Sequence, residues 1–195
     1  MASLLDRLSQ AMKHTHLPGR LRRLGMLLAL LLVCLGQVAR AEQGAVSEYG
    51  LKAVLLYKLP QFVYWPDTAK AQASLIFCIT GANPFGSSLE RLAREPVDGR
   101  SVEVINLAAI GDNINCDFIF ISRSEAANLD MILRKLAGKR MVTVSDIPGF
   151  AKAGGMVELT VSGDRVGVTL NRKAAQKQGL EFNAQLLRLA KVVEP

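Results

Sequence analysis

Two short, continuous apolar runs constrain the fold of this 195-residue chain more than any other feature. They are Leu75–Thr80 (LIFCIT) and Asp117–Ser122 (DFIFIS), and each has the length of a single strand. A run without polar alternation is typical of a strand that is buried on both faces, as in the middle of a parallel sheet. Further strand patterns occur at Val102–Leu107 and at Met141–Ser145. The central part of the chain therefore contains four candidate strands.

Helical patterns separate these strands. Asn83 and Pro84 suit the first positions of a helix after the first strand, and a second helix is expected from Ser124 to Gly138. Alternating strands and helices imply parallel pairing through right-handed crossovers, with helices on both faces of the sheet.

The end of the chain departs from this alternation. Met156–Val161 and Val166–Leu170 are predicted to form a hairpin, and Asn171 and Asn183 are placed to cap two final helices, the last of which carries Ala190. We therefore predict an α/β protein, a three-layer sandwich around a mixed, mostly parallel sheet of about six strands.

The first helix of the folded domain is expected over residues 47–63. Its buried stripe is predicted to contain five residues at helical spacing, with Lys52 and Lys58 off that stripe: Leu51, Val54, Leu55, Leu59 and Phe62. Tyr57, Tyr64 and Trp65 lie partly outside the stripe. They are either further core residues or a candidate surface for a partner or for self-association.

The N-terminal segment has the layout of a secretory signal peptide. Basic residues precede the apolar run Met26–Leu35, and Ala39-Arg40-Ala41 forms a small-x-small cleavage site. A run of about ten residues is too short to span a bilayer as a helix. Cys34 suggests a lipoprotein as the alternative. We predict a signal peptide over residues 1–41 and a periplasmic domain over residues 42–195.

The charge distribution argues against a nucleic-acid partner. The whole chain has a net charge of +7, but residues 42–195 carry 18 basic and 16 acidic side chains, a net charge of +2. The excess of basic residues lies in the signal peptide, whereas a nucleic-acid-binding protein carries its basic patch on the folded domain.

Export also affects how the cysteines and histidines are interpreted. After cleavage only Cys78 and Cys116 remain, and an oxidising compartment favours a disulfide between them. Two buried thiols on neighbouring strands are the alternative. Both histidines, His14 and His16, lie in the signal peptide, which excludes His-dependent catalytic triads and histidine metal sites in the domain.

The segment from Gly81 to Ser88 has the glycine spacing of a phosphate loop without its lysine. Gly81, Asn83, Gly86 and Ser87 are a candidate ligand-binding turn, although the pattern favours an ordinary strand-to-helix turn. We identify no catalytic constellation, no metal site and no cofactor, and expect a protein that is not an enzyme.

Several motifs in order along the domain resemble the YfiR-like family of periplasmic proteins. They are Glu48-Tyr49-Gly50-Leu51-Lys52-Ala53, Leu56-Tyr57-Lys58, Phe62-Val63-Tyr64-Trp65-Pro66, Cys78 with Gly81-x-Asn83-Pro84-Phe85-Gly86, Cys116-x-x-Ile119-Phe120-Ile121-Ser122, Thr143-Val144-Ser145-Asp146 with Phe150, Gly154-Gly155-Met156, and Asn171 with Leu180 and Leu186-Leu187-x-Leu189-Ala190.

The resemblance implies a negative regulator that binds the periplasmic sensing region of an inner-membrane diguanylate cyclase and lowers cyclic di-GMP, with effects on biofilm formation. It also implies a disulfide between the cysteines that match Cys78 and Cys116. A second disulfide known in the family has no counterpart, because no cysteine follows Cys116. A homodimer is a further candidate assembly, and a periplasmic small-molecule-binding sensor is the alternative function.

Overall fold

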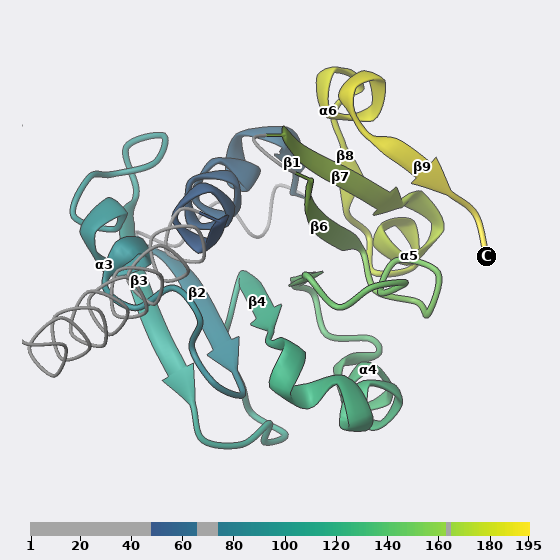
Figure 1. Ribbon diagram of the computed structural model, residues 1–195, viewed down its shortest axis with the longest axis horizontal. Coiled ribbons are helices and arrows are strands. Elements are labelled where there is room, and N and C mark those ends of the chain that lie inside the picture. The colour runs from purple at the N-terminus through teal and green to yellow at the C-terminus, as the bar shows by residue number, and fades with distance from the viewer. Residues whose placement is uncertain (1–47, 66–73, 163–164) are drawn as a thin grey trace, which may run out of the picture. The chain divides into compact units, whose positions relative to one another are not determined.

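The fold is built on a seven-stranded sheet, which we describe from a computed structural model (Figure 1). The structure describes residues 48–65, 74–162 and 165–195, all within one compact unit, Val46–Pro195. The predicted signal peptide, residues 1–41, lies outside the described residues. Across the described ranges, no helix is both long enough and apolar enough to cross a membrane.

The strand order in the sheet is β3-β2-β4-β5-β6-β7-β9. The strands are β2 (Ser74–Thr80), β3 (Ser101–Leu107), β4 (Phe118–Ile121), β5 (Val142–Ser145), β6 (Val157–Ser162), β7 (Arg165–Asn171) and β9 (Lys191–Val193). The five strands from β3 to β6 pair in parallel, the β6–β7 hairpin is antiparallel, and β9 pairs in parallel with β7. The predicted mixed, mostly parallel sheet is confirmed.

Three short strands were not predicted. β9 adds the seventh strand to the sheet, and β1 (Val63–Tyr64) pairs with β8 (Glu181–Phe182) in a separate two-stranded sheet. The last helix, α6 (Ala184–Leu189), therefore ends one residue before Ala190, whose backbone is already extended. Segments of two or three residues are too short to show an alternating pattern in the sequence.

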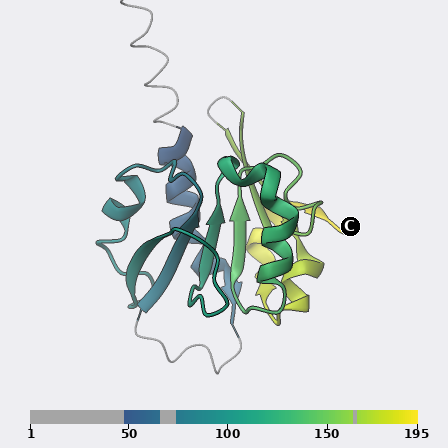
Figure 2. The same ribbon diagram turned by 90° about the horizontal axis from the view of Figure 1, so that it is seen from below.

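Helices cover both faces of the sheet and complete the predicted sandwich. In Figure 2, α4 (Leu129–Leu136) lies in front of the strands, while α5 (Arg172–Lys177), α6 and the helix over residues 48–58 lie behind them. Side chains of β4 alternate between the two layers, so Phe118 and Phe120 join one hydrophobic core and Ile119 and Ile121 join the other.

Two predicted helix caps are present. The side-chain Oδ1 of Asn171 accepts a hydrogen bond from the Ala174 N–H at 2.9 Å, and Oδ1 of Asn183 accepts one from the Leu186 N–H at 2.8 Å. These caps satisfy backbone donors that the first turn of a helix leaves without a partner. They fix the starts of α5 and α6.

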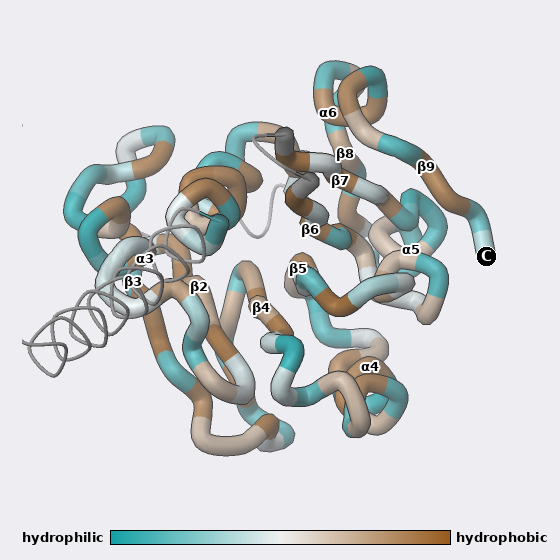
Figure 3. The backbone as a smooth tube through the Cα atoms, in the orientation of Figure 1, coloured by the Kyte–Doolittle hydropathy of each residue, from teal (hydrophilic) through white to brown (hydrophobic). Residues whose placement is uncertain are grey.

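The first helix is rotated from the predicted orientation. It spans residues 48–58 and continues into η1 (Leu59–Phe62), with Pro60 at the start of that 3-10 turn. Its buried face contains Lys52, Ala53, Leu56 and Tyr57, whereas the predicted stripe residues Leu51 and Val54 are exposed. Figure 3 shows hydrophobic residues on most turns of this helix. Periodicity alone could not identify the buried face, because apolar residues occupy more than one side.

Candidate functional site

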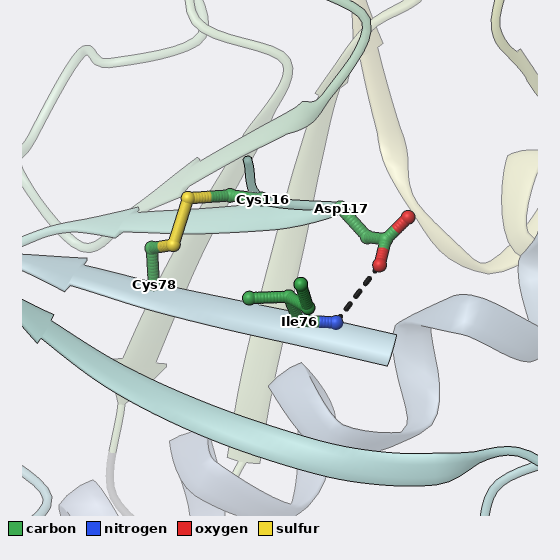
Figure 4. Close-up of a disulfide and its surroundings, with 4 residues drawn as sticks. All are labelled: Ile76, Cys78, Cys116 and Asp117. Atoms are coloured by element: carbon green, nitrogen blue, oxygen red, sulfur yellow. Dashed lines mark hydrogen bonds between the residues drawn. A yellow bond between two sulfur atoms is a disulfide. The ribbon is translucent and has the colours of Figure 1, made fainter. Parts of the chain in front are cut away.

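A disulfide joins Cys78 in β2 to Cys116, which lies just before β4 (Figure 4). The two residues are 38 positions apart, their Cα atoms are separated by 5.9 Å, and both side chains are buried. The bridge forms as the sequence indicated, and it is part of the core on the α4 face of the sheet.

Polar contacts reinforce this junction. The Asp117 carboxylate accepts a hydrogen bond from the Ile76 N–H at 2.8 Å, and the Asp117 N–H donates to the Ile76 carbonyl at 2.9 Å. The Arg100 guanidinium donates to the Ser74 carbonyl at 2.9 Å and lies 3.8 Å from the Asp117 carboxylate. The start of β4 is therefore fixed to β2 by one covalent bond and several polar ones.

A buried ion pair joins the first helix to the end of β5. Nζ of Lys52 lies 2.6 Å from Oδ2 of Asp146, and both side chains are fully buried. The Lys52 ammonium also binds the Glu48 carboxylate one turn earlier and lies 4.5 Å from the centroid of the Tyr49 ring. Because a buried charge is strongly unfavourable without a partner, the position of each group depends on the others.

Two further donors converge on the same carboxylate oxygen. The Tyr49 hydroxyl donates to Oδ2 of Asp146 at 3.0 Å, and Nε of Arg123 lies 3.1 Å from it. Nε of Arg123 also donates to the Asp146 backbone carbonyl at 3.1 Å. The other carboxylate oxygen, Oδ1, is buried and has no hydrogen-bond partner among the described residues. We call Glu48, Tyr49, Lys52, Arg123 and Asp146 the ion cluster.

The environment of the ion cluster keeps Tyr49 protonated. Burial, followed by the hydrogen bond to Asp146, raises the pKa of Tyr49 from 10.0 to about 12. Tyr49 therefore acts as a neutral donor at physiological pH. Two acidic and two basic side chains compensate one another, so the ion cluster works chemically as a clamp between the first helix, the end of β4 and the end of β5.

Sequence reasoning missed this clamp. It placed Lys52 off the buried stripe and named Asp146 only as part of the Thr143-Val144-Ser145-Asp146 motif. The available signal was weak: Asp146 directly follows a fully buried strand, and Glu48 and Lys52 have the i, i+4 spacing of a helical ion pair. Neither pattern indicates that the two segments meet.

The three aromatic residues of the candidate partner surface have different environments. Tyr57 is 5% exposed and donates its hydroxyl to the Glu95 carbonyl at 2.8 Å, so it belongs to the core and not to a surface. Trp65 is half-buried and its ring meets the Phe118 ring edge-on, at a centroid distance of 5.7 Å. Tyr64 is 63% exposed. The candidate surface is thus reduced to Tyr64 and the exposed part of Trp65.

The residues of the candidate ligand turn lie in different environments. Asn83 does not cap a helix; its Oδ1 accepts from the Phe85 N–H at 2.9 Å, and α3 (Ser88–Leu92) begins five residues later. Ser87 precedes α3 and its hydroxyl accepts from the Arg91 guanidinium at 2.8 Å. Gly81 alone of the four predicted residues lines a cavity of about 540 Å³ beside α4, whereas Asn83, Gly86 and Ser87 do not.

The double glycine before β6 has two separate roles. Gly154 has a φ of +108°, which side-chain-bearing residues rarely adopt. Gly155 lies against the Phe150 ring, where an added Cβ would be 2.1 Å from Cε1. The pair thus shapes the connection between β5 and β6. Within the described residues, no group of three or more His, Cys, Asp or Glu side chains is arranged to hold a metal ion.

Two comparisons with known proteins bear on this arrangement. A solved structure described as the ABC domain in complex with L-Trp from Streptococcus pneumonia resembles this chain with a TM-score of 0.51 at 11% sequence identity. The match covers 72% of this chain and 60% of that one, and at this identity it shows a shared fold only. The family model described as YfiR/HmsC-like matches residues 49–191, from Tyr49 of the ion cluster to the first residue of β9. The chain therefore belongs to the YfiR/HmsC-like family.

Proposed function

We propose that this protein is exported by the signal peptide over residues 1–41 and acts in the periplasm as a negative regulator of cyclic di-GMP signalling. The family match over residues 49–191 carries the proposal, because it spans nearly the whole described domain. In this proposal the domain binds the periplasmic sensing region of an inner-membrane diguanylate cyclase and restrains it without chemistry of its own.

The exposed aromatic residues at β1 are the proposed contact surface. Tyr64 is largely exposed and Trp65 is half-buried, and both residue types are enriched among interface hot spots. Trp65 is held in place by Phe118, so part of this surface is fixed before a partner binds. Leu51 and Val54 add exposed apolar area on the preceding helix.

Deletion of the gene tests the regulatory proposal. We expect cellular cyclic di-GMP and surface attachment to rise, and secreted wild-type protein to restore both. Tyr64→Ala should fail to restore them although the protein remains folded, because the side chain is largely solvated. Val192→Ala is the matched control, since Val192 is also an exposed apolar residue but lies on β9, at the edge of the seven-stranded sheet. Unchanged cyclic di-GMP after deletion would refute the proposal.

A periplasmic small-molecule sensor is the second candidate function. One observation favours it, the cavity lined by Gly81 at the ends of the parallel strands. A metabolite that binds the purified protein, together with unchanged cyclic di-GMP after deletion, would replace the regulatory proposal by this one.

A further inference from the structure

The topology places a crevice at the carboxyl ends of β2 and β4. β2 lies between β3 and β4, and all three strands run in parallel. The connection after β2 leads to β3 on one side, whereas the connection after β3 returns across β2 to β4 on the other side. In open α/β sheets, ligands bind outside the strand ends at such a reversal of strand order.

A cavity lies at this edge of the sheet. Its volume is about 540 Å³, within the usual range for small-molecule sites. Its walls come from the turn after β2, the segment after β3, η3 (Arg123–Asn128) and α4. The cavity is therefore lined by the segments that follow β2 and β4, the two strands on either side of the reversal.

Close packing fixes the turn after β2. The Ala82 N–H donates to the Ser124 hydroxyl at 2.9 Å, and Gly81 has a φ of +83°. A Cβ at Gly81 would lie 2.4 Å from Oγ of Ser124, so only glycine allows this approach. Gly81 is thus explained by contact with η3, and the wall that it forms is present before any ligand binds.

The walls combine aliphatic and polar surface, and one unpaired cation lies among them. Leu107, Ile110, Met131 and Ile132 supply aliphatic surface, and Met131 is 46% exposed. Lys135 lines the same cavity one helical turn after Met131, and within the described ranges it forms no hydrogen bond or ion pair.

Glu125 in the cavity wall keeps its negative charge, but one of its carboxylate oxygens binds Asn128, which does not line the cavity. Oε2 of Glu125 accepts from the Asn128 amide at 3.0 Å, and the Glu125 side chain lies against Gly81. The aliphatic part of the wall beside an unpaired ammonium favours a ligand with an aliphatic body and a negative head group.

We propose that this cavity binds a small aliphatic carboxylate, with its aliphatic body against Leu107, Ile110 and Met131 and its head group at Lys135. This proposal extends the second candidate function, the periplasmic small-molecule sensor, by naming the class of ligand that the protein binds. It stands independently of cyclase binding, because it is tested on the purified protein while the regulatory proposal is tested by cyclic di-GMP in cells.

Three probes with the same six-carbon body separate the contributions to binding. Hexanoate, hexanol and hexylammonium are titrated at pH 7 into ¹⁵N-labelled protein purified from the periplasm. We expect hexanoate to shift the amide signals of Gly81, Ile110 and Ile132, and to bind at least tenfold more tightly than hexanol. Tighter binding of hexylammonium than of hexanoate would overturn the proposal, since it would assign the head group to Glu125.

Two variants test the assigned residues. Lys135→Gln should reduce hexanoate affinity to that of hexanol, and Met131→Trp should fill the cavity and abolish binding of all three probes. Both positions are exposed, so the fold should persist, and the amide spectrum verifies it. Lys177→Gln, an exposed lysine on α5, is the matched control and should leave binding unchanged. Unchanged hexanoate binding in both cavity variants, or no binding to the wild type, would also overturn the proposal.

Discussion

Replacing Lys52 by Met tests whether the ion cluster holds the first helix on the sheet. Met keeps a long unbranched side chain and a good helix propensity but removes the ammonium. Asp146 would remain fully buried with Tyr49 and Arg123 as its donors, while Glu48, whose side chain is one-third exposed, turns to water. The variant therefore measures what the buried Lys52 ammonium contributes, because the other donors to Asp146 stay in place.

The expected loss follows from what remains around Asp146. Breaking a buried ion pair lowers the free energy of unfolding by about 3–5 kcal/mol. Because Arg123 stays within 3.1 Å of the same oxygen, we expect the lower end, about 3 kcal/mol. For a domain of this size that corresponds to a fall in Tm of roughly 6–12 °C.

Urea unfolding of the disulfide-bonded protein measures this loss, with an unchanged m-value as the check that the denatured state is comparable. Lys58→Met is the matched control, since Lys58 is exposed on the same helix, and it should change stability by no more than about 0.5 kcal/mol. Asp146→Asn should lower the free energy of unfolding both in the wild type and in Lys52→Met. The loss should be about 1–3 kcal/mol smaller in Lys52→Met, because the buried ion pair is already broken there. Equal effects of Lys52→Met and Lys58→Met would refute the reasoning.

Three other variants probe separate parts of the fold. The double variant Cys78→Ala/Cys116→Ala should lower the free energy of unfolding by up to about 4 kcal/mol, because the closed loop in the unfolded chain is lost; reducing agent should then have no further effect. Tyr49→Phe should weaken the fall in stability between pH 10 and 12. The folded protein holds the Tyr49 proton more tightly than the unfolded chain, so this contribution is complete below pH 10 and is lost as the pH rises to about 12. Gly155→Ala should lower stability by at least about 1–3 kcal/mol through the clash with Phe150, whereas Gly50→Ala, with no atom within 4 Å of the added Cβ, should raise it by up to about 1 kcal/mol. Equal effects of the two glycine substitutions would contradict the packing argument.

The sequence predicted the sheet well because its central strands are buried on both faces. LIFCIT and DFIFIS leave no choice of face, so their apolar runs locate β2 and β4 to within one residue at each end. The caps of α5 and α6 were equally predictable, because an Asn at the N-cap accepts a hydrogen bond from a backbone N–H only three residues later in the chain. These features depend on residues that are close together in the chain.

The ion cluster was not predictable by the same means. Lys52 and Asp146 are 94 positions apart, and no local pattern distinguishes a lysine that is buried against a distant carboxylate from one that is solvated. The same holds for Asn83, whose side chain is suited to a helix cap but forms a tight turn with Phe85 instead. For Lys52 a tertiary contact decides between the alternatives, whereas for Asn83 the choice lies between two local hydrogen-bonding patterns that the sequence leaves open.

The orientation of the first helix bears on the proposed contact surface, because it decides whether Leu51 and Val54 are exposed. Leu51, Val54 and Leu55 are as suited to burial as Ala53 and Leu56, so apolar packing alone does not determine which face meets the sheet. We infer that the Lys52–Asp146 pair selects the orientation, and thereby leaves Leu51 and Val54 on the outside. The doubly apolar variant Lys52→Leu/Asp146→Leu should then retain much of its stability but lose the unique orientation. Methyl NMR with a soluble paramagnetic probe measures this directly, because the Leu51 and Val54 methyl groups are broadened in the wild type and should become protected in part of the variant population. If these two residues keep their wild-type exposure in the variant, apolar packing alone sets the orientation and the ion cluster contributes only stability.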